Sequence, residues 1–420
     1  MSTVAHPAAR GHRTMRLPLA EADYERFLGD SEFAKAQLAG LYDQHPELFP
    51  AGWEQGYVCY GFTSVSRKQG RRCRRVRLRA SGEVFTVAPA FLMPYLRATV
   101  AEVEKAVFLM RFHVPCWALA YVFGRDAMYW YRLGQTLGRF SVVGTTVKAP
   151  GRLPQDLVAD EKHSRLDGKK IYLATTAGEG CLLGASVTEA ASEAALIQAY
   201  GVFAEEARAL EPDYAPETVN TDGWPATQGA WQALFPTITV ILCFLHAFLK
   251  IRHRATKALT EVFALVGNQV WHAYRAPTKA AFAQRLRRLR EWAERTLPAS
   301  PMKTHTLELC AKRASFSRSY DHERTHRTSN LVDRLIKFLD RACFNAQYFH
   351  GTVASAELRV RTLALLWNFC PSSPATVKRY HGQRCPAERL NGKRYAEHWL
   401  ENLLVSGSMN GLRHHQQKPL

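Results

Sequence analysis

Three acidic residues, far apart along the chain, are of a type and in local settings that can hold metal ions. Asp160 lies within a run of strand-forming residues, 157–163, and Asp222 directly follows the strand-like segment 219–221. Asp333 falls in the first turns of an expected helix. Carboxylate oxygens are hard ligands that suit Mg²⁺ or Mn²⁺, and two such ions roughly 4 Å apart can promote phosphodiester cleavage and transfer. We therefore predict that these three acids are catalytic and bind the metal.

The third acid has several rivals nearby. Thr328 or Ser329 can cap a helix that continues to about residue 339. Asn330 and Asp333 are three residues apart, so both project from one side of that helix. We prefer Asp333 for this reason, and the neighbouring acids that compete with it are Asp321, Glu323 and Asp340.

The order of the expected elements brings the first two acids together. Three strands, a helix, a strand, a helix and a strand follow one another, which is the order of the ribonuclease-H-like fold, where the first and fourth strands are neighbours. Asp160 and Asp222 would then converge although they are 62 residues apart, and a cation would relieve the repulsion between their carboxylates. By itself, Asp222 could equally be a turn or helix-cap residue. The expected strands are 157–163, 170–176, 181–187, 219–221 and 239–243, and the expected helices are 192–210 and 225–234.

A set of short motifs resembles bacterial DDE-type insertion-sequence transposases with a Mutator-like catalytic domain. The matching residues are Asp222, Phe235-Pro236, Cys243 with His246, and Thr328-Ser329-Asn330 with Asp333, while Asp160 matches less specifically. The resemblance covers roughly residues 100–370. It implies a DNA transposase that binds transposon ends and uses Mg²⁺, or Mn²⁺, to cleave and transfer strands. One departure is that the third acid is usually Glu in that group, whereas here it is Asp.

The pair Cys243 and His246 has the spacing of zinc ligands, but a second ligand pair is not evident. We interpret Cys243, His246 and Asn330 as structural residues near the site, with His246 orienting the active site or the DNA.

The charge of the chain favours a polyanionic partner. Its 56 Lys and Arg against 37 Asp and Glu give a formal net charge of +19, which is typical of nucleic-acid binding. Alternation in 75–79 places arginines on one face of a strand, although charge can also serve only to protect a sheet edge. The predicted DNA contacts are Arg67, Lys68, Arg71, Arg72, Arg74, Arg75, Arg77, Arg79, Tyr129, Arg132, Arg285, Arg288 and Arg327.

Residues 99–141 are expected to form a helix-turn-helix. A helix ends at Phe123-Gly124, and Asp126 caps the next, which carries Tyr129 and Arg132. A small helical bundle without a role in DNA binding would show the same periodicity.

The nine scattered cysteines indicate no disulfide framework, and no apolar run is long enough to span a bilayer. We expect a cytoplasmic, nucleoid-associated homodimer on double-stranded DNA, with terminal repeats and target DNA as partners. The functional alternatives are a catalytically silent, transposase-derived DNA-binding protein, which the Asp at the third position keeps open, and a structure-specific nuclease.

The predicted fold is α/β: a ribonuclease-H-like mixed sheet with an all-α insertion, preceded by a small β-ribbon and the helix-turn-helix. Residues 1–20 are expected to be a loose tail. The expected divisions are 1–50, tail and helices; 51–98, basic β-ribbon; 99–141, helix-turn-helix; 152–250 and 326–370, the two parts of the catalytic domain; 251–325, insertion; and 371–420, basic C-terminal region.

Overall fold

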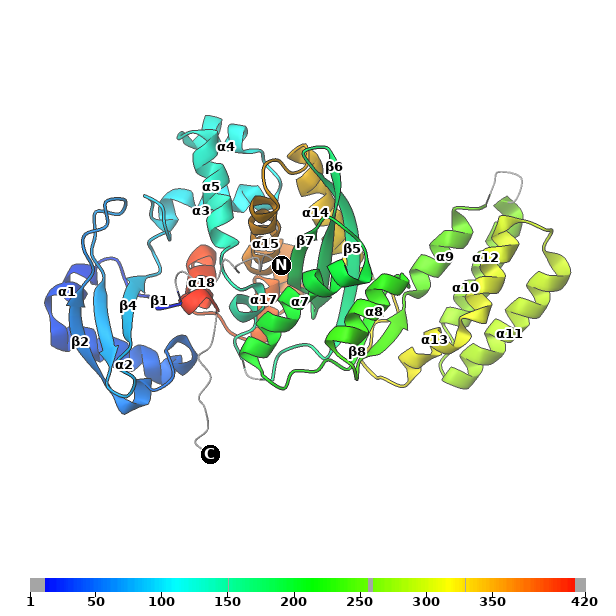
Figure 1. The fold of residues 1–420 in the computed structure, drawn as a ribbon, viewed down its shortest axis with the longest axis horizontal. Coiled ribbons are helices and arrows are strands. Elements are labelled where there is room, and N and C mark those ends of the chain that lie inside the picture. The colour runs from blue at the N-terminus through cyan, green and yellow to red at the C-terminus, as the bar shows by residue number, and fades with distance from the viewer. Residues whose placement is uncertain (1–11, 150, 256–259, 329, 412–420) are drawn as a thin grey trace.

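The computed structural model describes residues 12–149, 151–255, 260–328 and 330–411, and the side chains of 330–333 lie outside the described part. The chain is elongated, with a small sheet at one end, a larger sheet in the middle and a group of helices at the other end (Figure 1). No helix in the described ranges is both long and apolar enough to cross a membrane.

The central sheet has five strands in the order β7-β6-β5-β8-β9. The strands are β5 (Asp156–Leu166), β6 (Lys169–Gly178), β7 (Cys181–Thr188), β8 (Thr218–Thr221) and β9 (Thr239–Leu242). The first three are antiparallel, whereas β8 is parallel to both β5 and β9. The prediction of a mixed α/β sheet whose first and fourth strands are neighbours is therefore confirmed.

Helices cover both faces of this sheet (Figure 1). They are α6 (Val142–Thr146), α7 (Glu193–Leu210), α8 (Pro225–Leu234), α14 (Asn330–Asn345) and α15 (Val353–Phe369). Phe203, Trp231 and Phe235 fill the core beneath α7 and α8, and Leu335 and Val360 fill the core beneath α14 and α15. The chain turns between α14 and α15, so that both helices pack on this face of the sheet.

An all-α segment follows β9, as expected for the insertion. Its helices are α9 (Phe244–Arg252), α10 (Thr260–Tyr274), α11 (Lys279–Thr296), α12 (Pro301–Ala311) and α13 (Arg313–Ser317), followed by the 3₁₀ turn η5 (Arg318–Tyr320). The apolar residues of α11 recur at helical spacing, and Phe282, Leu286 and Leu289 are all buried. They pack with Phe244 and Phe316 in one core.

The N-terminal sheet has four strands in the order β1-β4-β3-β2. Its elements are β1 (Thr14–Leu17), α1 (Tyr24–Gly29), α2 (Ser31–Gln44), η2 (Pro46–Leu48), η3 (Trp53–Gln55), β2 (Tyr57–Phe62), β3 (Arg74–Leu78) and β4 (Val84–Pro89). The expectation of a loose tail is wrong for β1, which pairs in parallel with β4 and buries Met15 and Leu17. A four-residue strand is too short to show clear alternation, and its partner lies much later in the chain. Residues 1–11, also assigned to the tail, lie outside the described residues.

Three helices occupy the segment expected to be a helix-turn-helix: α3 (Val100–Arg111), α4 (Cys116–Phe123) and α5 (Ala127–Leu137). A capping box between Thr99 and Glu102 begins the first of them. Leu133 of α5 shares one core with Leu365 of α15 and with Leu400 near the C-terminus. The segment therefore has no core separate from the rest of the chain.

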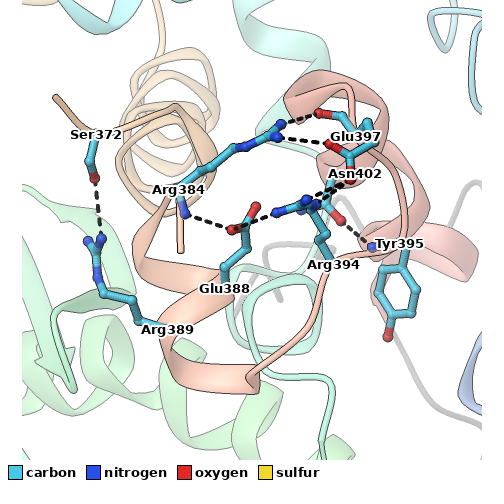
Figure 2. A network of polar contacts seen from close by, with 8 residues as sticks. All are labelled: Ser372, Arg384, Glu388, Arg389, Arg394, Tyr395, Glu397 and Asn402. Carbon is cyan, nitrogen blue, oxygen red and sulfur yellow. Dashed lines mark hydrogen bonds and ion pairs between the residues drawn. The ribbon is translucent and has the colours of Figure 1, made fainter. Parts of the chain in front are cut away.

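The C-terminal segment contains α16 (Pro374–Arg379), α17 (Pro386–Asn391), α18 (Trp399–Ser406) and η6 (Ser408–Gly411). Figure 2 shows how its charges pair with each other: Arg384 and Arg394 bond to Glu397 at 2.8 and 2.6 Å, and Arg394 lies 3.7 Å from Glu388. The backbone N–H of Arg384 also donates to Glu388, at 2.7 Å. These arginines, expected to form a basic region, are thus occupied in joining α17 to α18.

The same segment reaches back to the N-terminal sheet. Val405 and Met409 belong to the core of that sheet, and the backbone N–H of Arg16 donates to the Ser408 hydroxyl at 2.9 Å. Lys393 and Tyr395 both bond to Glu47. The C-terminal segment, up to residue 411, therefore joins the small sheet to the helices beside the central sheet.

A buried ion pair joins the central sheet to the helices that precede it. Arg361 of α15 bonds to Glu206 of α7 at 2.5 Å, and both side chains are less than a tenth exposed. Arg361 also donates to the carbonyls of Gly138 and Phe140, while Glu206 accepts from the Ser141 hydroxyl. Every member of this network has hydrogen-bond partners, as buried charges require.

We predict that Arg361→Leu lowers the free energy of unfolding by about 3–5 kcal/mol, because it leaves the Glu206 carboxylate buried without its cation. The double variant Arg361→Leu, Glu206→Leu should be less destabilised than Arg361→Leu alone. Urea denaturation followed by circular dichroism measures both. The exposed Arg341→Leu on α14 is the control, expected within about 0.5 kcal/mol of wild type, and equal losses for Arg341→Leu and Arg361→Leu would contradict the prediction.

Candidate active site

The parallel pairing of β5 with β8 brings the first two acids to the same level. Val158 is paired with Asn220, and Asp160 and Asp222 each lie two residues further along. The two carboxyl groups are close enough for the charge of Asp222 to raise the pKa of Asp160. The prediction that these two acids converge is therefore confirmed.

Asp160 is half-buried, and its surroundings disfavour the ionised form of its carboxyl group. The pKa of Asp160 is raised to about 7; burial is the largest cause, and the negative charges of Asp222 and Glu161 contribute to the rise. His246 lowers the pKa of Asp160, as does the backbone N–H of Glu161, which donates to Oδ1 at 2.8 Å. A carboxyl group in this setting is poised to accept a cation in place of its proton.

Asp222 is oriented by the turn that follows β8. Its Oδ1 accepts the backbone N–H of Trp224 at 2.8 Å, and Gly223 between them has a φ of +92°, a left-handed conformation that favours glycine. The turn-residue interpretation is therefore confirmed for one carboxylate oxygen. The second oxygen has no such partner among the described residues.

Asp222 also borders a small cavity of about 40 Å³ shared with the helical insertion. Lys250 of α9 and His305, Glu308 and Lys312 from the α12 region line the same cavity. The insertion thus places cationic and acidic side chains beside the second acid.

The chain approaches α14 along the ends of β8 and β9. The carbonyl of His326 accepts from Asn220 Nδ2 at 2.9 Å, and the carbonyl of Arg327 accepts from the backbone N–H of Phe244 at 3.2 Å. The Thr325 and Thr218 hydroxyls lie 2.9 Å apart. These contacts bring the chain that leads into α14 next to β8, the strand that Asp222 follows.

The first turn of α14 lies level with Asp160 by the dimensions of the two elements. Lys162 of β5 pairs with Asp340 of α14 at 2.9 Å, and the backbone N–H of Phe349 beyond the helix donates to the carbonyl of Arg165, so strand and helix run in the same direction. Residue 333 precedes Asp340 by about 10 Å of helix. The same length covers about three residues of a strand. Counted back along β5 from Lys162, it ends close to Asp160.

The side chains of Asp333 and Asn330, the predicted third acid and its neighbour, lie outside the described residues. Within the described residues, no group of three His, Cys, Asp or Glu is placed to hold a metal ion. The carboxylates of Asp160 and Asp222 would suit Mg²⁺ or Mn²⁺, because a divalent cation would relieve both their mutual repulsion and the cost of burying Asp160.

Cys243 is a buried structural residue. Its backbone N–H donates to the carbonyl of Thr221 at 2.7 Å, and it stands at the N-cap of α9. His246 follows in the first turn of that helix and interacts electrostatically with Asp160. With this Cys-x-x-His spacing, Cys243 ends the connection from β9, and His246, one turn into α9, lies near the first acid.

Three residues beneath the site were missed by the sequence reasoning. Glu161 is buried, and its Oε1 accepts the Tyr200 and Thr227 hydroxyls, each at 2.7 Å. Burial raises the pKa of Glu161. The available signal was an acid next to Asp160 whose alternation places it on the opposite, core-facing side of β5.

Some of the predicted DNA contacts are exposed at the surface, and others bond to groups of the protein itself. Arg75 and Arg77 of β3 flank the exposed ring of Tyr60, at 5.4 and 4.8 Å from its centroid, whereas Arg71 pairs with Glu21 at 2.9 Å. The side chains on the surface are those of Arg67, Lys68, Arg72, Arg77, Arg79, Arg132 and Arg288.

Several of the predicted contacts are wrong or are committed to the protein itself. Arg74 is buried and donates to the carbonyls of Phe27 and Leu28, because it shares the inward face of β3 with Val76 and Leu78. Arg327 is half-buried among aromatic rings and donates to the Tyr320 hydroxyl. Arg285 donates to the carbonyl of His272, and the Tyr129 hydroxyl is buried.

The expected recognition helix, α5, is held against the central part of the protein. Tyr131 and Gln135 bond to the Ser355 hydroxyl of α15, at 2.6 and 2.7 Å, and Arg132 stays exposed. By contrast, α4 exposes Trp117 and Tyr121. The outward surface of this segment therefore lies more on α4 than the prediction placed it.

Comparisons with known proteins add no family: the sequence matches no protein-family model, and no curated protein matches it significantly. The observations that bear on function are therefore the paired acids, their neighbours and the basic surface.

We predict that Asp160→Asn stabilises the metal-free protein at pH 8 but not near pH 4. The folded protein holds a proton on Asp160 up to about pH 7, whereas the ordinary value is 3.8, so wild-type stability falls as pH rises through this window. The neutral amide removes that loss. Thermal unfolding in EDTA at several pH values measures the difference, with the exposed Asp340→Asn as the control. A stability difference that does not change with pH would contradict the assignment.

Proposed function

We propose that the protein is a DDE-type DNA transposase with a ribonuclease-H-like catalytic domain. It would bind transposon ends and catalyse metal-dependent cleavage and strand transfer. The observation that carries the proposal is the pair Asp160 and Asp222, level with each other on neighbouring parallel strands, with residue 333 expected at the same level on α14.

The topology supports this proposal. The strand order β7-β6-β5-β8-β9 is the order expected of a ribonuclease-H-like sheet. The all-α segment between β9 and α14 separates the second acid from the third in the chain, as the resemblance to these transposases implies. Its return segment, 325–327, runs directly past the strand ends.

The chain's own residues would perform distinct tasks in the reaction. Asp160, Asp222 and Asp333 would hold Mg²⁺, which supplies Lewis-acid activation of the attacking oxygen and stabilisation of the leaving oxygen. The Trp224 N–H orients Asp222, and the Glu161 N–H orients Asp160. A 3′-hydroxyl released at the transposon end would then attack target DNA in line, without a covalent intermediate on the protein.

The distribution of positive charge supports DNA as the substrate. Arg75 and Arg77 beside Tyr60 form one exposed surface on the N-terminal sheet, and Arg288 lies on α11 in the insertion. These elements lie on opposite sides of the central sheet (Figure 1). DNA binding through these surfaces should weaken steeply with salt because phosphate contacts release counterions.

The decisive test is Asp222→Ala on DNA ends taken from the inverted repeats that flank the gene. Cleavage in Mg²⁺ should fall at least about a thousandfold, since the metal ligand supplies several kcal/mol of transition-state stabilisation. End binding, measured by gel shift, should stay within about threefold. Cleavage by Asp222→Ala, or binding without cleavage by the wild-type protein in Mg²⁺, would overturn the proposal.

The third acid is tested by comparing Asp333→Asn with Asp340→Asn. Both lie on α14, but Asp340 is paired with Lys162. We expect Asp333→Asn to be as inactive as Asp222→Ala, whereas Asp340→Asn should keep cleavage within a few-fold of wild type. The reverse result would move the third acid to position 340.

A further inference from the structure

The outer face of the N-terminal sheet contains a second, larger cavity, of about 340 Å³. Strands β1 and β4 form its floor, and the segments 66–69 and 92–95 form its sides. This volume lies at the lower end of the range for small-molecule sites. The polar and aromatic side chains that line it include Thr14, Arg16, Lys68, Gln69, Thr86 and Tyr95.

Hydrogen bonds hold the two sides of this cavity together. Gln69 Nε2 donates to the carbonyl of Met93 at 2.7 Å, and Lys68 Nζ donates to the carbonyl of Tyr95 at 3.1 Å. Tyr95 has a φ of +61°, which is unusual for a bulky residue, and the Arg139 guanidinium lies 4.9 Å from its ring centroid. The cavity is therefore preformed, with an aromatic ring fixed at its edge.

The cavity carries positive charge without a matching acid. No carboxylate lines it, and within the described residues neither Arg16 nor Lys68 forms an ion pair. The guanidinium of Arg16 donates to the carbonyl of Leu92, at 3.4 Å. Arg16 is half-buried, and burial lowers its pKa. An anionic group of a ligand, placed between Arg16 and Lys68, could form charge-assisted hydrogen bonds with both.

We propose that this cavity binds a nucleoside 5′-monophosphate unit, with its phosphate against Arg16 and Lys68 and its base against Tyr95. The cavity is several times larger than a phosphate ion, and its hydroxyl, amide and aromatic groups suit a sugar and a base. Two sources offer this chemistry: a free nucleotide, or a nucleotide turned out of bound DNA. Only the second source rests on the proposed function.

The test uses the full-length protein and dAMP in calorimetric titrations. We expect saturable binding that weakens about tenfold in Arg16→Gln and several-fold in Lys68→Gln, because each loses a charge-assisted contact. Arg13→Gln is the matched control, since Arg13 precedes β1 and pairs with Glu83 outside the cavity, and it should bind dAMP as wild type does.

Circular dichroism checks that Arg16→Gln folds, and the exposed Lys68→Gln keeps the test decisive if it does not. Absence of saturable dAMP binding up to millimolar concentrations would overturn the proposal. So would an equal loss in Arg13→Gln, or competition by inorganic phosphate as effective as that by dAMP, since either would indicate a general attraction for anions.

The source of the nucleotide is resolved with duplex DNA that carries 2-aminopurine at successive positions. Brightening at one position with wild type, lost in Arg16→Gln, assigns the cavity to a base turned out of DNA. Binding of dAMP with no brightening at any position assigns it to a free nucleotide. Failure of the cavity leaves the Asp222→Ala cleavage result untouched, so the two proposals are refuted separately.

Discussion

The pairing of β5 with β8 is the interaction on which the rest of the site depends. It is short, but its parallel register sets Asp160 level with Asp222. Two carboxyl groups held this way, one of them half-buried, repel each other. His246 and backbone N–H donors offset part of this repulsion. The pKa of Asp160 stays raised because the offset is incomplete. A fold that stabilises such a pair only in part is suited to a cation that completes the site.

The surroundings of this pair hold it rigidly. Glu161, directly behind Asp160, is tied to α7 and α8 by the Tyr200 and Thr227 hydroxyls, so β5 cannot slide or turn without breaking buried hydrogen bonds. On the opposite face, Lys162 ties β5 to α14 through Asp340. The buried hydrogen bonds of Glu161 are therefore the contacts that hold this strand in place, whereas the partly exposed ion pair contributes little.

The basic residues fall into two groups, those that bond within the protein and those that stay exposed. Arg74, Arg327 and Arg361 hold backbone carbonyls, rings or a buried carboxylate, and the arginines of Figure 2 join C-terminal helices. Other basic side chains stay exposed, among them Arg77 on the N-terminal sheet and Arg288 on α11. The net charge of +19 therefore includes both buried structural cations and exposed ones, and the cavity beside β1 has basic residues in its lining but no carboxylate.

The sequence by itself determined the order of strands and helices in the central region, the position of the two acids on or directly after neighbouring strands, and the helical nature of the insertion. These features rest on local patterns, such as β-branched runs, apolar residues at helical spacing, and turn residues, which a single stretch of chain displays. The strand position of residues 14–17, the burial of Arg74 and the hydroxyl partners of Glu161 were decided only by the tertiary structure. So were the packing of α5 on α15 and the cavity around Arg16. Each of these depends on contacts between segments far apart in the chain, and such contacts leave no periodic signal in either segment alone.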